Sequence, residues 1–280
     1  AASDVYKRQR YQYVKKDDRA VIYREAADPS LVVFHGKYYM FPSMTKGYFI
    51  SEDMVNWQVK KLQGLPVYDY APDVRVMGEY LYFSASRRDA NCDFYRTKDP
   101  ESGVFEKIEG TFDFWDPNLF VDDDGRAYQF YSSENNETMY ISLLTDDYLK
   151  PSGRFTRNFV KESREAPAVF KYNGKYYMLS SGCTGWDPNV AEIAVADSIM
   201  GTWKTIGNPC TGPDADKTFY AQSTYVQPVI GKKDAYIAMF DRWKKKDLED
   251  SRYVWLPVLV KDGKITIPWH EKWTLSIFDK

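Results

Sequence analysis

The sequence predicts an all-β protein, a five-bladed β-propeller, and three observations lead to this prediction. A motif recurs five times along the 280 residues: a short apolar run, a turn, and a second run rich in tyrosine. The prolines of the five copies are separated by 43, 45, 50 and 61 positions, a period typical of propeller blades. Aromatic residues make up 17% of the chain, which suits strands. One copy per blade gives five blades.

Each copy has the pattern of a β-hairpin. In chain order the copies span residues 28–41, 71–83, 116–128, 165–179 and 226–240. A glycine separates the two strand-forming runs of each copy, as a tight turn requires, and the clearest turn is 122–125, where three aspartates precede the glycine. The proline is predicted at the start of the first strand, where its missing N–H costs nothing. Five unrelated hairpins in a β-sandwich are the alternative, and the shared order of the motif argues against it.

The chain shows no linker, charge block or low-complexity tract, which indicates a single domain. We expect a foreign or disordered leader over residues 1–19 and one propeller domain over residues 20–280, because the first ten residues resemble neither a native start nor a signal peptide. No apolar run is long enough to span a bilayer. A net charge of −2 gives no reason to expect nucleic acid or a membrane as partner, and we expect a monomer.

Three of the five copies begin at a carboxylate. Asp28 and Asp116 each stand one position before their proline, and Glu165 stands two before. In a propeller the first strand of each blade lines a central channel, and all first strands are entered from the same face. The three acids should therefore converge on one funnel. A capping role is the plain alternative for an aspartate before proline.

Crowded carboxylates in a partly desolvated funnel push their pKa values apart, so that one is protonated and another is ionised. Hydrolysis of a glycosidic bond requires such a pair. A carboxyl separation of about 6.5–9.5 Å leaves room for a water and inverts the anomeric carbon, whereas about 5–5.5 Å gives retention. The sequence alone does not supply the separation.

Other catalytic or metal-binding patterns are missing. The three cysteines have no paired or metal-type spacing, and the two histidines, His35 and His270, have no partner at ligand spacing. Acid–base hydrolysis requires no cofactor. We therefore predict no metal site, and nothing in the sequence indicates a structural calcium in the channel.

Several segments resemble the motifs of glycoside hydrolase family 43, in order and in spacing, from residue 28 to the C-terminus. They are 27–30 with 36–39, 71–74, 116–125 and 165–171. The resemblance implies a five-bladed propeller that hydrolyses glycosides with inversion. It implies that Asp28 is the general base, that Glu165 is the general acid, and that Asp116 holds the pKa and the orientation of the acid.

Segments 220–225, 240–243 and 253–257 are similar to the galactan-cleaving branch of the family. That branch lacks the usual base aspartate and uses a glutamine, which matches Gln222. Because this chain retains Asp28, we assign the base to Asp28 and treat Gln222 as a substrate contact.

Five residues are predicted to bind substrate. Besides Gln222, they are Trp186 in a loop after the fourth hairpin, Trp115 beside Asp116, Arg242, and Asp73, the acid of the second copy. An indole can stack on a sugar ring, although buried packing is the alternative for each tryptophan. Trp57 and Trp203 are interpreted as structural residues of outer strands.

The predicted function is an inverting, exo-acting glycoside hydrolase that releases α-L-arabinofuranose or β-D-xylose from plant-type oligosaccharides or polysaccharides. The alternatives are a β-galactosidase or galactofuranosidase of the same family, a phosphorylase or retaining fructosidase on the same fold, and a carbohydrate-binding propeller without catalysis. For such an enzyme we expect secretion or a periplasmic location in a bacterium.

Overall fold

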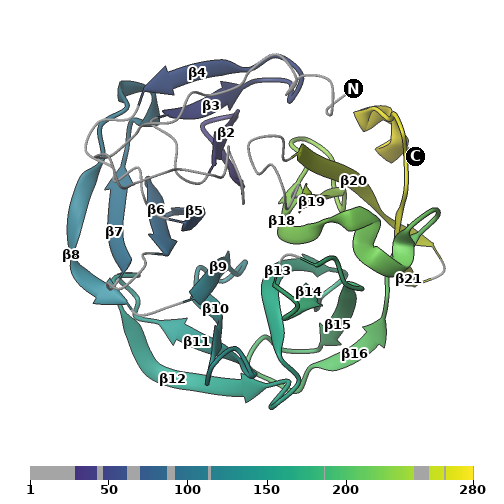
Figure 1. Ribbon diagram of the computed structural model, residues 1–280. Helices are drawn as coiled ribbons and strands as arrows, with labels where there is room; N and C mark the ends of the chain where they lie inside the picture. Colours follow the sequence, from purple (N-terminus) through teal and green to yellow (C-terminus); the bar gives the residue numbers. More distant parts are fainter. Residues whose placement is uncertain are drawn as a thin grey trace, which may run out of the picture.

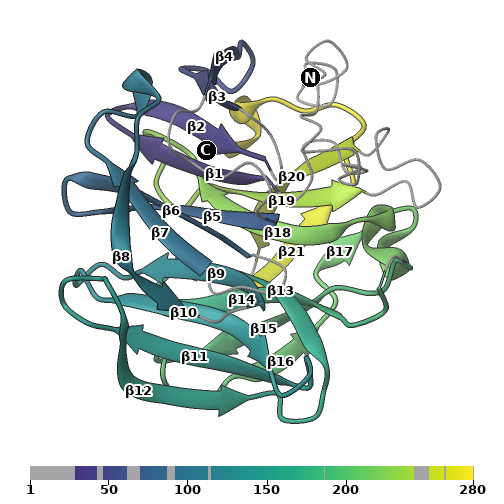
Figure 2. The ribbon, with the colours of Figure 1, turned by 60° about the vertical axis from the view of Figure 1, so that its left-hand side comes forward.

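The computed structural model describes residues 29–42, 47–61, 70–86, 92–112, 115–185, 187–242, 252–261 and 263–279. The predicted leader, residues 1–19, lies outside these ranges. Within them the protein is a five-bladed β-propeller, and the predicted fold class is confirmed (Figure 1). Figure 2 shows the blades in an oblique view. None of the helices in the described ranges is long and apolar enough to cross a bilayer.

The first three blades are four-stranded antiparallel sheets whose strands follow one another in the chain. Blade 1 holds β1 (Ser30–Phe34), β2 (Lys37–Phe41), β3 (Gly47–Ser51) and β4 (Gln58–Lys61). Blade 2 holds β5 (Tyr70–Met77), β6 (Tyr80–Ser86), β7 (Cys92–Thr97) and β8 (Glu106–Phe112). Blade 3 holds β9 (Trp115–Val121), β10 (Ala127–Ser133), β11 (Thr138–Leu144) and β12 (Pro151–Asn158).

Blade 4 has the same order, and blade 5 adds a strand. Blade 4 holds β13 (Arg164–Tyr172), β14 (Lys175–Gly182), β15 (Glu192–Ala196) and β16 (Lys204–Gly207). Blade 5 holds β18 (Gln222–Pro228), β19 (Tyr236–Arg242), β20 (Arg252–Lys261) and β21 (Lys264–Pro268), with the short β17 (Cys210–Thr211) parallel to β21. Helical structure is confined to three short 3₁₀ turns in the described ranges: η2 (Pro100–Ser102), η3 (Ala215–Tyr220) and η5 (Leu275–Phe278).

The predicted hairpins join the first two strands of the blades. The five turn glycines of the repeat, at 36, 78, 125, 174 and 231, all have φ between 59° and 81°, a conformation that L side chains rarely adopt. The first strands β1, β5, β9, β13 and β18 contact one another around the ring and line the centre. The hairpin prediction is confirmed by this arrangement.

The prolines do not stand at the first strand position, and this expectation was wrong. In blades 2, 3 and 4 the proline lies inside the first strand, where Pro72, Pro117 and Pro167 each belong to a β-bulge of two residues opposite one. A bulge tolerates proline because the ladder is locally interrupted there. In blade 5 the equivalent bulge lies at Thr224, so Pro228, the last residue of β18, is not the counterpart of the other prolines.

In the described ranges the core is divided into five clusters, one at each contact between neighbouring blades. Most tyrosines of the repeat are buried in these clusters. Trp57 and Trp203 are also buried, each 7% exposed, and each donates its indole N–H to a carbonyl in the connection before the fourth strand of its blade. Their structural assignment is confirmed.

Candidate active site

The structure describes the predicted site residues to different extents. Asp28 and Trp186 lie outside the described residues, so the Asp28–Glu165 separation does too. Trp115 and Asp116 lie in β9, and their backbone positions are described. The side chains of Glu165, Gln222, Arg242 and Asp73 have described surroundings.

Glu165 is the second residue of β13 and stands directly before the bulge of that strand. It pairs with Ser181 of β14, and the next regular pair is Ala168 with Leu179. Ala166, inside the bulge, has φ of 52°, which is rare for a residue with a side chain. Bulges re-aim side chains and often lie beside active sites. The local structure thus sets the direction of Glu165 at the point where β13 enters the ring.

The same bulge shows that the acids do not occupy equivalent positions. In blade 3 the two bulged residues are Asp116 and Pro117, opposite Tyr131, and in blade 4 they are Ala166 and Pro167, opposite Ser180. Asp116 is therefore a bulge residue, whereas the counterpart of Glu165 is Trp115. The positions of Asp116 and Glu165 thus differ by one residue, as their distances from the proline do, and both lie at the entry of a first strand.

Gln222 meets Glu165 across the boundary between blades 4 and 5. Its Nε2 donates hydrogen bonds to Glu165 Oε1 at 2.9 Å and to Ser181 Oγ at 2.7 Å, although 57 positions separate Gln222 from Glu165. Gln222 is the first residue of β18, where it pairs with Asp241 two positions before the bulge at Thr224. The amide group therefore uses both of its hydrogens to hold the carboxylate and the strand beside it.

Two serines fix β13 between its neighbours at this entry. Ser132 Oγ of β10 donates to the carbonyl of Arg164 at 3.2 Å, and Ser223 Oγ of β18 donates to the carbonyl of Ala166 at 2.8 Å. Arg164 is buried and forms an ion pair with Glu192 at 2.8 Å, and burial lowers its pKa. These contacts leave Glu165 on a strand whose two edges are held, which favours precise positioning of the acid.

Asp73 is engaged in contacts between blades. It is 6% exposed, pairs with Arg75 at 2.7 Å, and accepts a hydrogen bond from the backbone N–H of Leu119 in blade 3. Burial raises its pKa to about 6, against the opposing effects of Arg75 and the Leu119 N–H. The prediction that Asp73 contacts substrate has no support in this position.

Arg75 reaches three other blades from β5 of blade 2. Its guanidinium donates to the carbonyl of Leu119 in blade 3 and to Ser30 Oγ in blade 1, the latter at 3.3 Å, and it lies 4.0 Å from the ring centre of Tyr225 in blade 5. Sequence reasoning missed this residue, because nothing in the second copy marks an arginine as a channel residue.

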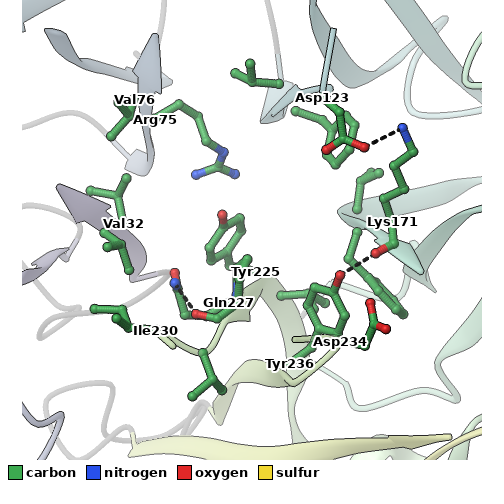
Figure 3. Close-up of a pocket in the computed structure, with 18 of the residues that line it drawn as sticks. Val32, Arg75, Val76, Asp123, Lys171, Tyr225, Gln227, Ile230, Asp234 and Tyr236 are labelled. Atoms are coloured by element: carbon green, nitrogen blue, oxygen red, sulfur yellow. Dashed lines mark hydrogen bonds and ion pairs between the residues drawn. The ribbon is translucent and has the colours of Figure 1, made fainter. Parts of the chain in front are cut away.

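A large cavity lies at the opposite end of the first strands (Figure 3). Its volume is about 910 Å³, and Arg75 points into it. Near its mouth Lys171 pairs with Asp123 at 2.9 Å, and the Tyr236 hydroxyl donates to the Lys171 carbonyl. Lys171 stands six positions after Glu165 on β13, about 20 Å away along a strand. This cavity is therefore not the site of the acids.

Arg242 forms hydrogen bonds with the segment that contains Phe219. Its Nε and Nη2 donate to the carbonyl of Phe219 at 2.9 and 2.6 Å, and its guanidinium lies 5.4 Å from the ring centre of Trp269. These contacts give no support to the prediction that Arg242 binds substrate. Within the described part of the chain, no group of three or more His, Cys, Asp or Glu residues could hold a metal ion.

Comparison with known proteins decides the family. Residues 18–227 match the family described as Glycosyl hydrolases family 43. The chain belongs to glycoside hydrolase family 43. The family 43 chain is accordingly a glycoside hydrolase, and the resemblance inferred from its motifs is confirmed. A search of the curated proteins found no match.

Solved structures of the same family are similar over nearly the whole chain. A GH43 β-1,3-galactosidase with galactodeoxynojirimycin shares 30% identity at a TM-score of 0.81, over 96% of this chain and 99% of that chain. A second GH43 β-1,3-galactosidase shares 30% identity at a TM-score of 0.82, over 96% of this chain and 64% of that chain. An exo-β-1,3-galactanase from Clostridium thermocellum shares 25% identity at a TM-score of 0.75, over 92% of this chain and 64% of that chain.

These relatives bear on the predicted activity. The glycoside hydrolase assignment is confirmed, whereas the arabinofuranosidase or xylosidase type is not, since the similar structures are galactosidases and galactanases. The similarity of three segments to the galactan-cleaving branch agrees with the structures.

Proposed function

We propose that this family 43 enzyme is an exo-acting β-galactosidase that hydrolyses β-1,3-linked galactosides with inversion. The names of the two relatives at 30% identity support the sugar and the linkage. The observation that carries the proposal is the hydrogen bond from Gln222 to Glu165, because it joins the predicted acid to the glutamine that marks the galactan-cleaving branch.

In the proposed mechanism Glu165 protonates the leaving oxygen as the glycosidic bond breaks. The Gln222 amide, which also donates to Ser181 Oγ, holds the Glu165 carboxylate in one orientation. Asp28 takes a proton from the water that attacks the anomeric carbon from the opposite side, and Asp116 helps to keep the acid protonated through the repulsion of like charges. The water supplies the hydroxyl of the released sugar, and the proton from Glu165 ends on the leaving group.

The test is a panel of glycosides with the wild-type enzyme and Glu165→Gln. The wild type is expected to prefer β-1,3-galactobiose and aryl β-galactosides to α-L-arabinofuranosides and β-D-xylosides, and proton NMR is expected to show the α-anomer first. Glu165→Gln should lose about 10²–10⁴-fold in kcat on galactobiose, the usual contribution of general acid catalysis. It should lose far less on 2,4-dinitrophenyl β-galactoside, whose leaving group needs no proton.

Three results would contradict the proposal. Equal losses of Glu165→Gln on both leaving groups would show that Glu165 is not the acid. Preference for arabinofuranosides or xylosides would restore the activity predicted first, which the retained Asp28 favours. Binding of sugars without hydrolysis of any of these glycosides would identify a carbohydrate-binding propeller.

A further inference from the structure

A shallow depression lies on the rim beside the candidate acid, between blades 4 and 5. Its lining residues come from the end of β14, the loop that follows it, the end of η3 and the start of β18, and they include Ser181, Asn189, Tyr220 and Gln222. Its volume of about 20 Å³ is enough for one water or one hydroxyl group and far too small for a sugar ring. A ring could only rest over it, with one hydroxyl inserted.

The depression shares two residues with the acid site. Gln222 and Ser181 line it, and Gln222 also donates to Glu165 Oε1. Both amide hydrogens of Gln222 are used by Glu165 and Ser181, so its Oε1 is the atom that remains to accept a hydrogen bond. A group in the depression is therefore next to the acid, on the side of β14, which is farther from the channel axis than β13.

Tyr220 forms an exposed aromatic wall at this place. It is 42% exposed, and its hydroxyl donates to Asp214 Oδ1 at 3.2 Å. Thr218, Phe219 and Tyr220 have φ of 50°, 57° and 57°, three consecutive side-chain-bearing residues in the left-handed region. Such strain persists only where the surroundings enforce it, and it is concentrated at functional sites.

Buried contacts of the two residues before Tyr220 hold the strained backbone in place. Thr218 and Phe219 are both 1% exposed. Thr218 Oγ1 donates to the carbonyl of Asn189 at 2.8 Å and accepts from the N–H of Ala191 at 2.6 Å. Phe219 packs on Trp269 at 5.2 Å between ring centres. The strained backbone thus presents Tyr220 outward from a rigid base.

The opposite wall of the depression is also fixed. The Asn189 side chain donates from Nδ2 to the carbonyl of Gly182 at 2.7 Å and to Thr184 Oγ1 at 2.6 Å, and it accepts from the N–H of Gly182 at 3.0 Å. These bonds close the loop after β14 on itself. The depression is therefore preformed, which lowers the entropy cost of binding.

From these observations we infer that Tyr220 and the adjacent depression bind the leaving-group sugar, with the Tyr220 ring against the sugar face and one sugar hydroxyl at Gln222 Oε1. The inference rests on the proposed hydrolase. The acid protonates the oxygen that joins the two sugars, so the leaving sugar begins within reach of Glu165. A pyranose presents an apolar face of C–H groups that packs on an aromatic ring, as in other sugar-binding surfaces.

The kinetic test compares β-1,3-galactobiose with methyl β-galactoside, whose leaving group is too small to reach Tyr220. In Tyr220→Ala the ratio of kcat/KM for galactobiose to that for methyl galactoside should fall about three- to tenfold, as expected for the loss of one aromatic contact. Tyr220→Phe keeps the ring and should restore most of the ratio. Phe155→Ala, which removes a 55% exposed aromatic from β12 in blade 3, is the matched control.

A second readout does not depend on catalysis. In a Glu165→Gln background, calorimetry measures the affinity for galactobiose and for galactose, and adding Tyr220→Ala should weaken galactobiose selectively. An equal loss of affinity for galactobiose and galactose, or no loss of affinity for either, would overturn the assignment of Tyr220 to the leaving-group subsite. If the wild type hydrolyses no glycoside, the proposed function fails, and the calorimetric comparison still supports or overturns the role of Tyr220.

Discussion

At the scale of single residues, the candidate site depends on the side-chain amide of Gln222. Gln222 ties the acid of blade 4 to blade 5 through two hydrogen bonds from the same Nε2. The sequence suggested Gln222 as a substrate contact, and the structure adds a positioning role. An amide donor favours the ionised form of a carboxylate and restricts its rotation. Gln222 therefore affects both the orientation of Glu165 and the pH at which it gives up its proton.

Gln222→Ala tests this role. We expect kcat to fall about 10- to 100-fold, because a hydrogen bond to a charged group contributes about 1.5–3 kcal/mol. The alkaline limb of the kcat profile should also move to higher pH, because the carboxylate form of Glu165 loses a donor. Ser181→Ala should give a smaller effect in the same direction. A lower kcat with an unmoved profile would mean that Gln222 instead supports the attacking water.

At the scale of elements, bulges and the C-terminal segment shape the molecule. The four bulges lie at the entry ends of β5, β9, β13 and β18, so the site is built where the ladders are interrupted. The ring closes between blades 5 and 1. In the described sheets, no strand belongs to both of these blades. Trp273 packs in the cluster between these blades, and its indole donates to the carbonyl of Trp255 at 2.8 Å.

Trp273→Ala should weaken this closure. Removing a largely enclosed indole costs about 3 kcal/mol, which corresponds to a fall in Tm of about 6–12 °C for a domain of this size. Thermal unfolding followed by circular dichroism measures the shift. Phe155→Ala, on an exposed edge, should change Tm by only about 1–2 °C. Similar shifts for the two variants would show that the C-terminal segment does not secure the ring.

At the scale of the whole molecule, a buried arginine links the blades around the channel. Arg75 contacts blades 1, 3 and 5 from blade 2, while Asp73 compensates its charge. A carboxyl whose pKa is higher in the folded than in the unfolded chain stabilises the fold at low pH and loses that contribution as pH rises. For Asp73 the loss runs from about 4, its ordinary pKa, to about 6.

Arg75→Met removes the cation that opposes the burial of Asp73. The pKa of Asp73 should rise further, so that the loss of stability continues to higher pH than in the wild type. We expect the Tm deficit of the variant to be larger at pH 8 than at pH 5. Lys98→Met, which breaks an exposed ion pair with Glu79, is the control. A deficit that is equal at both pH values would exclude this charge effect.

The repeat motif predicted part of the candidate site but not all of it. The position of Glu165 at a strand entry was predictable because the motif fixes the hairpin around it. The one-residue offset between Glu165 and Asp116 was visible too, because Glu165 stands two positions before its proline and Asp116 one. The β-bulges that hold these prolines were not predictable, because a bulge depends on how two strands pair. The misplaced fifth copy has the same cause: Pro228 matched the motif, yet the strand pairing puts Thr224 at the bulge.

The sequence by itself determined the five blades, their turns and the tyrosine-rich core, because alternation and turn chemistry act over a few neighbouring residues. Only the tertiary structure brought Gln222 to Glu165, bound Asp73 and Arg75 into contacts between blades, and placed Tyr220 on the rim beside the acid. These contacts join residues tens of positions apart. They exist only after the ring has closed, and the closed ring is set by the packing of all five blades against one another.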